Sequence, residues 1–187
     1  MKFISIAFIA LFCSTVLAKE SENKEVTKFE APIIKTAKVE NEGVSIDFKD
    51  AIAVKTEKYG KEILIYLFPE TLSLELKKEV LSQIKLFFIR GKLPKLKGYK
   101  HPSYVKMSFS FNDLEKLSKG KMESFHAALC GFAKENSTIM NLNSNKNDSN
   151  FTKVIKKFDY KDGSLSIDIS YDNDFTVKLK TKVYTQD

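Results

Sequence analysis

His126 and Cys130, within SFHAALCGFAK (Ser124–Lys134), are residue types that can build a nucleophile, because an imidazole can take the proton of a thiol. A helix would place the two side chains about 6 Å apart. A strand would separate them by roughly 13 Å, beyond a hydrogen bond. The stretch fits both periods, and the strands expected on either side favour a strand. Its apolar neighbours also indicate an unreactive thiol, so we expect no catalytic residue and no enzyme.

The second candidate site is a basic segment, Arg90–Lys106, inside a stretch from Val80 to Asn112 that contains no Asp or Glu. Recurring Gly and Pro predict a loop, and aromatic rings beside cations suit carbohydrate, lipid-headgroup or nucleic-acid surfaces. We predict an exposed loop with weak, salt-sensitive affinity for anionic surfaces, either lipid headgroups or polysaccharide. The alternative is a solvated connection whose lysines balance acids elsewhere. The candidate contacts are Arg90, Lys92, Lys95, Lys97, Tyr99, Lys100, His101 and Tyr104.

The chain carries a formal charge of +7, and Arg90 is its only arginine. Bidentate recognition of phosphate or guanine depends on arginine, so nucleic acid is an unlikely partner. Lys178, Lys180 and Lys182 alternate with apolar residues in the expected C-terminal strand. They could form a basic ladder for a polyanion or protect an exposed sheet edge, and we favour the edge because exposed lysine is the usual protection.

Metal and cofactor motifs are missing from the sequence. The two histidines, His101 and His126, stand in different segments, and no paired-ligand spacing occurs. The stretches NSNKND and YDND are typical of turns, and the first lacks the glycine and terminal glutamate of an EF-hand. There is no glycine-rich phosphate loop and no nucleophile-elbow pattern. We therefore expect no metal and no cofactor.

The N-terminus has the pattern of a signal peptide covering residues 1–18. Lys2 precedes the apolar run Phe3–Phe12, and Val16-Leu17-Ala18 provides a cleavage site. A lipid on Cys13 is a competing interpretation, which bulky Phe12 disfavours. We expect an exported protein, periplasmic or secreted, without a transmembrane segment after cleavage. Residues 19–30 should form a flexible polar leader and residues 31–187 a single β-rich domain.

The elements that must position any site are mostly strands. Alternation predicts strands near 44–49 and 105–111, while the apolar run 63–68 predicts a central strand covered on both faces. An amphipathic pattern predicts one helix at about 73–90. Two C-terminal strands are joined by a turn at 172–174, and 141–150 reads as a polar loop. The expected fold is mainly β (α+β), an antiparallel sheet forming a sandwich or partly closed barrel with the helix packed on it.

These features favour an exported, non-enzymatic interaction domain that contacts an anionic surface or a partner protein. The first alternative is a carrier that holds an apolar ligand between sheet and helix, among the phenylalanines. The second alternative, which fewer features support, is a thiol- or carboxylate-dependent enzyme.

Overall fold

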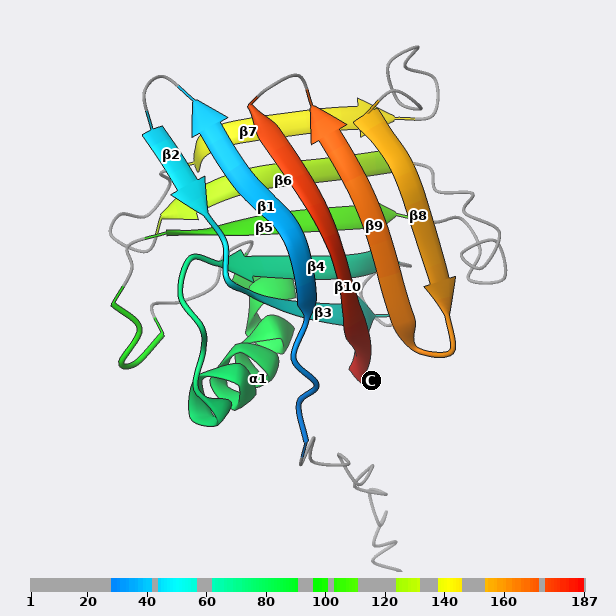
Figure 1. Ribbon diagram of the computed structural model, residues 1–187. Helices are drawn as coiled ribbons and strands as arrows, with labels where there is room; N and C mark the ends of the chain where they lie inside the picture. Colours follow the sequence, from blue (N-terminus) through cyan, green and yellow to red (C-terminus); the bar gives the residue numbers. More distant parts are fainter. Residues whose placement is uncertain are drawn as a thin grey trace, which may run out of the picture.

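The computed structural model describes residues 28–41, 44–56, 62–90, 96–100, 103–110, 124–131, 138–145, 154–171 and 174–186. The described residues form a mainly β structure with one helix (Figure 1). In chain order the elements are β1 (Ile33–Asn41), β2 (Val44–Asp47), β3 (Asp50–Thr56), β4 (Glu62–Phe68), α1 (Leu74–Arg90), β5 (Ser103–Ser110), β6 (Ser124–Gly131), β7 (Thr138–Asn145), β8 (Ile155–Lys161), β9 (Ser164–Tyr171) and β10 (Phe175–Gln186).

The ten strands belong to one mixed sheet that is not closed. Its main path runs β2-β1-β10-β3-β4-β5-β6-β7, while β9 pairs with β10 and β8 pairs with β9. The prediction of a mainly β fold is confirmed, with two corrections. β10 and β3 run parallel, and the sheet does not close into a barrel.

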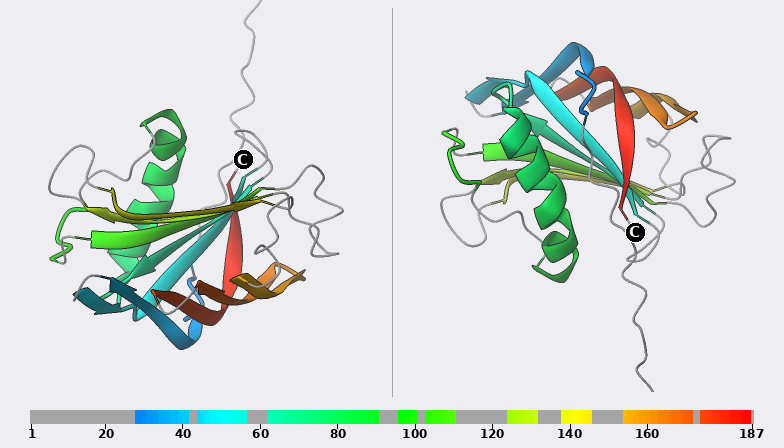
Figure 2. Two further views of the ribbon diagram at one scale, coloured as in Figure 1. Left: turned by 90° about the horizontal axis from the view of Figure 1, so that it is seen from above. Right: turned by 90° about the horizontal axis from the view of Figure 1, so that it is seen from below.

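β10 joins two layers of strands. Its first half lies between β1 and β9, and its last residues, Val183–Gln186, pair with β3. Figures 1 and 2 show β2, β1, β10, β9 and β8 in one layer and β3 to β7 in the other. Because β10 has neighbours on both sides, the prediction that Lys178, Lys180 and Lys182 protect a sheet edge is wrong.

One buried cluster receives side chains from both layers. On β5, Val105, Met107 and Phe109 are fully buried there, as their alternation predicts. From the other layer Val177 and Leu179 of β10 join the same cluster. Each such side chain stabilises the fold by about 1.5–3 kcal/mol when it is removed from water.

β4 is covered on both faces, as its uninterrupted apolar sequence predicts. Ile63 and Ile65 belong to the cluster shared by the two layers, whereas Leu64 and Tyr66 belong to a second cluster that includes Val80 and Ile84 of α1. The described side chains of β4 after Glu62 are all buried. A strand with two buried faces has no need of polar alternation.

α1 begins at a serine cap. The Ser73 hydroxyl accepts a hydrogen bond from the Leu76 amide at 3.2 Å, which satisfies one of the amides that the first turn leaves without a helical partner. Glu75 adds a negative charge in that turn, where it interacts favourably with the helix dipole. The predicted helix at about 73–90 is therefore confirmed by Leu74–Arg90.

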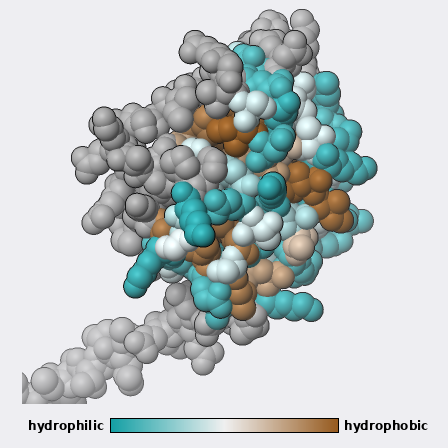
Figure 3. Space-filling model, turned by 60° about the vertical axis from the view of Figure 1, so that its left-hand side comes forward, coloured by the Kyte–Doolittle hydropathy of each residue, from teal (hydrophilic) through white to brown (hydrophobic). Residues whose placement is uncertain are grey.

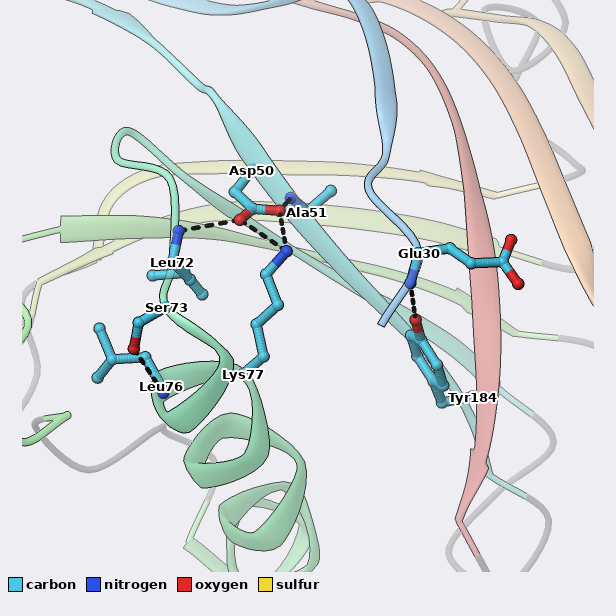
Figure 4. Close-up of polar contacts among 8 residues, drawn as sticks. All are labelled: Glu30, Asp50, Ala51, Leu72, Ser73, Leu76, Lys77 and Tyr184. Carbon is cyan, nitrogen blue, oxygen red and sulfur yellow. Dashed lines mark hydrogen bonds and ion pairs between the residues drawn. The ribbon is translucent and has the colours of Figure 1, made fainter. Parts of the chain in front are cut away.

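A buried ion pair connects α1 to the start of β3 (Figure 4). The Lys77 ammonium lies 2.9 Å from one carboxylate oxygen of Asp50 and 3.1 Å from the other. The same carboxylate accepts hydrogen bonds from the amides of Ala51, at 2.8 Å, and Leu72, at 2.9 Å. Asp50 is 1% exposed, so this carboxylate exchanges water for three protein donors.

Two strands were not predicted, and a third contradicts the prediction of a loop. β1 and β8 were not predicted, and each contains a register shift that interrupts the two-residue alternation. The polar-loop prediction is wrong for Asn141–Asn145, which belongs to β7 and pairs with β6; residues 146–150 lie outside the described residues. Main-chain hydrogen bonds form a ladder whatever the side chains, so an Asn- and Ser-rich strand remains compatible with a sheet. Ser124–Gly131 is a strand, as we favoured.

Candidate functional site

The basic segment does not form one continuous described surface. Arg90 is the last residue of α1, while Lys92, Lys95 and His101 lie outside the described residues. Lys97 and Lys100 are exposed. The Lys97 amide donates to the carboxylate of Glu79 at 3.0 Å, so an acid lies close to this part of the segment.

The two tyrosines of the segment are buried. Tyr99 packs edge-on against Phe68, with ring centroids 5.7 Å apart, and its hydroxyl donates to the Ser103 carbonyl at 3.2 Å. Tyr104 is 1% exposed and stacks on the same phenylalanine. Burial raises the pKa of Tyr99. The two rings thus hold the segment against the sheet. The prediction that Tyr99 and Tyr104 contact an anionic surface beside the lysines is wrong, because both side chains are buried.

A different set of lysines gathers on the outer side of the layer formed by β1, β10, β9 and β8. Along β10, Val177 and Leu179 point into the core, so Lys178 and Lys180 point outward. The neighbouring strands add lysines from distant parts of the chain. We call the following set the lysine face: Lys35, Lys157, Lys161, Lys178 and Lys180.

Two adjoining depressions, each of about 400 Å³, lie on the lysine face. Both are lined by Lys157, Ser166 and Lys180. The strand register explains this, because Lys180 stands directly opposite Ser166 across the β9–β10 pair. On the other side of β9, Lys157 pairs with Asp168, two residues along the strand from Ser166. Diagonal neighbours of this kind lie within reach of long side chains.

The depression nearer β1 is the more positive of the two. The described residues that line it include four lysines and one acid, a formal net charge of +3. The other depression has three lysines and two acids, a net charge of +1. An anionic group would therefore be attracted to the β1 side. The charged residues of the first are Lys35, Lys157, Lys178, Lys180 and Asp168, and those of the second are Lys157, Lys161, Lys180, Asp159 and Asp162.

Ion pairs neutralise some cations of this layer and leave others available. The Lys178 ammonium lies 2.7 Å from Asp168. Next to the lysine face, Lys182 lies 2.7 Å from Glu30 and lowers the pKa of that carboxyl. Among the described residues, no ion pair involves the other four members of the lysine face: Lys35, Lys157, Lys161 and Lys180.

One exposed apolar residue lines the more positive depression. Ile33 is 60% exposed, lines that depression and stands directly opposite Lys180 across the β1–β10 pair. Such exposure is unusual, since Leu74 of α1 is the only other exposed large hydrophobic residue among those whose side-chain burial the structure describes. On the side of the molecule drawn in Figure 3, hydrophobic surface occurs in small areas separated by hydrophilic side chains.

The geometry at Cys130 agrees with a strand. Cys130 and His126 stand four residues apart on β6, where they pair with Tyr104 and Ser108 of β5, respectively. The Cys130 thiol is partly exposed and lies 3.7 Å from the Ala128 carbonyl. Nearby, burial lowers the pKa of Lys106. The described residues contain no group of three or more His, Cys, Asp or Glu side chains that could hold a metal ion.

Comparison with protein-family models, curated proteins and solved structures found no match for this chain. Within the described residues, no helix has the length and apolar character needed to cross a membrane. The candidate site therefore rests on its geometry. The sequence showed the alternating lysines of β10, but Lys35 and Lys157 carried no signal, because strand pairing brings them from distant positions to the same face.

Proposed function

We propose that this protein is an exported, non-enzymatic interaction domain that binds anionic surfaces through the lysine face. The observation that carries the proposal is the meeting of Lys35, Lys157 and Lys180 at one depression of net charge +3. Among the described residues these three cations have no acidic partner within ion-pair distance. The exposed Lys97 and Lys100 of the basic segment add to the attraction but do not line this depression.

The charges of the lysine face predict a weak, salt-sensitive interaction. Attraction to an anionic bilayer is about 1 kcal/mol for each lysine near the surface, and exposed charges are screened over about 8 Å at physiological salt. Three free lysines therefore give measurable but reversible binding. Lysine is a hydrated point charge without the planar fork of arginine, which suits a diffuse anionic surface better than one oriented phosphate.

The proposal includes the finer architecture and the location of the protein. In this proposal the two strand layers form a sandwich, and α1 covers the outer side of β3 and β4. The outer side of the other layer, formed by β1, β10, β9 and β8, is the binding surface. Cleavage after Ala18 would release the exported chain, as the N-terminal pattern predicts. Mass spectrometry of the native protein tests this part, and a mass that includes Met1–Ala18 would contradict it.

Two triple variants with the same change of net charge test the binding surface. In the first, Lys35, Lys157 and Lys180 are each replaced by Glu. In the control, the same replacement is made at three exposed lysines away from the lysine face: Lys49, Lys97 and Lys100. Both are measured for retention on heparin and on phosphatidylcholine vesicles containing phosphatidylglycerol, over a range of salt concentrations, with thermal unfolding as the check on folding.

We expect the first variant to lose retention at a salt concentration where the control still binds. Equal losses would show that overall charge, not the lysine face, determines binding. A larger loss in the control would place the site in the basic segment. If the unaltered protein binds neither probe at low salt, the proposed function is wrong.

A further inference from the structure

We propose that the anionic surface is a lipid bilayer and that Ile33 inserts into its headgroup region while the surrounding lysines contact the lipid phosphates. This inference rests on the proposed function and narrows it to one kind of surface. It depends on the position of an exposed apolar side chain among cations, a feature that binding of a soluble polyanion does not require.

The strand register fixes Ile33 on the lysine face. Ile33 pairs with Lys180 of β10, so the two side chains project from the same side of the sheet. Ile34, the next residue, packs against the core shared by the two layers, which leaves Ile33 pointing outward with 60% of its surface exposed. Lys35 and Lys178 line the same depression. An isoleucine is thus bordered by cations from β1 and β10.

This arrangement matches the boundary between headgroups and acyl chains. An apolar side chain gains free energy by leaving water there, and lysines have long apolar stems that let their ammonium groups remain at the phosphates. A soluble polyanion offers the same negative charge but no apolar layer for Ile33. The lysine face also has Ser164 and Ser166 between its cations, and none of the described residues that line either depression is aromatic, which disfavours stacking on sugar rings.

The absence of tryptophan from the chain permits a direct measurement. Ile33→Trp introduces a single fluorescent reporter at the proposed insertion point. Leu74→Trp is the matched control, because Leu74 is also exposed (45%) but lies at the start of α1. We expect the emission of Ile33→Trp to shift to shorter wavelength when vesicles of phosphatidylcholine and phosphatidylglycerol are added. The emission of Leu74→Trp should not change.

Ile33→Ser provides a second measurement that does not depend on a bulky probe. We expect its affinity for the same vesicles to fall about tenfold, the order of magnitude for losing one buried aliphatic side chain. Its retention on heparin should be unchanged, because no charge is altered. Unchanged thermal unfolding will confirm that the exposed substitution leaves the fold intact.

The outcomes separate this inference from the proposed function. If Ile33→Ser binds vesicles as tightly as the unaltered protein and the emission of Ile33→Trp does not shift, the inference is overturned. The proposed function still stands in that case if charge reversal of the lysines abolishes binding. Binding to heparin without binding to vesicles would identify a soluble polyanion and would also overturn it. If lysine reversal has no effect on either probe, the proposed function fails first.

Discussion

Among the described polar contacts, the ion pair between Asp50 and Lys77 should be the one whose loss lowers the stability of the fold most. Lys77→Met removes the ammonium but keeps a side chain of similar length in the same space. The Asp50 carboxylate then remains buried, at 1% exposure, and the donors left to it among the described residues are the amides of Ala51 and Leu72. Removing one member of a buried pair costs about 3–5 kcal/mol, because the remaining charge is desolvated without compensation.

This magnitude is large compared with the stability of an ordinary domain, about 5–15 kcal/mol. Adding Asp50→Asn to Lys77→Met removes the stranded charge and leaves one side-chain oxygen to accept an amide. We therefore expect the double variant to be more stable than Lys77→Met alone by at least about 1 kcal/mol. Lys178→Met is the matched control, since its pair with Asp168 is exposed and should contribute less than about 1 kcal/mol.

Urea unfolding followed by circular dichroism measures all four proteins, and equal slopes against urea will show that the unfolded states are comparable. If Lys77→Met costs no more than Lys178→Met, the buried pair does not hold α1 to β3. If the double variant is less stable than Lys77→Met alone, the hydrogen bonds of the carboxylate, and not its charge, dominate. Either result would refute the reasoning.

Two further predictions follow from the backbone and from the buried rings. Gly163 lies in the two-residue turn between β8 and β9 with a φ of +71°, so Gly163→Ala should lower the free energy of unfolding, measured in urea, by about 1–2 kcal/mol. No heavy atom lies within 4 Å of the added carbon. A much larger loss would therefore contradict a purely conformational cause. Burial raises the pKa values of Tyr66 and Tyr99, so their contribution to stability is complete below the unfolded pKa of about 10 and is lost as the pH rises above it. Thermal unfolding across this range, with absorbance of tyrosinate, checks the sign; ionisation of both rings near pH 10 in the folded protein would refute it.

Local patterns predicted the elements that local forces determine. The run ILIYLF of β4 has two buried faces, and α1 has an apolar stripe behind a serine cap. β1 and β8 were missed because a register shift in each disturbs the alternation. The turn Asp162-Gly163 was a usable signal for the hairpin of β8 and β9, since both residues adopt positive φ.

The candidate site was predictable only in part, because it depends on pairing between distant strands. The alternation of Lys178 and Lys180 predicted a basic side of β10 but could not reveal which strands flank it. Tyr99 and Tyr104 were predicted on the surface because they are interleaved with lysines in the sequence, whereas both rings pack against Phe68 in the core. The ion pair between Asp50 and Lys77 could not be predicted from the sequence either, because Lys77 has the spacing of an ordinary helix residue.

The position of β10 has a consequence for the order of folding. β10 is synthesised after β1, β3 and β9, yet it pairs with all three and joins the two layers. A nascent chain can form β3–β4 or α1 early, but the strand pairing that joins the layers, between β10 and β3, requires that Phe175–Gln186 has been translated. Contacts of such high sequence separation fold slowly. Until β10 has been translated, the apolar strands that it pairs with remain exposed to water and to chaperones.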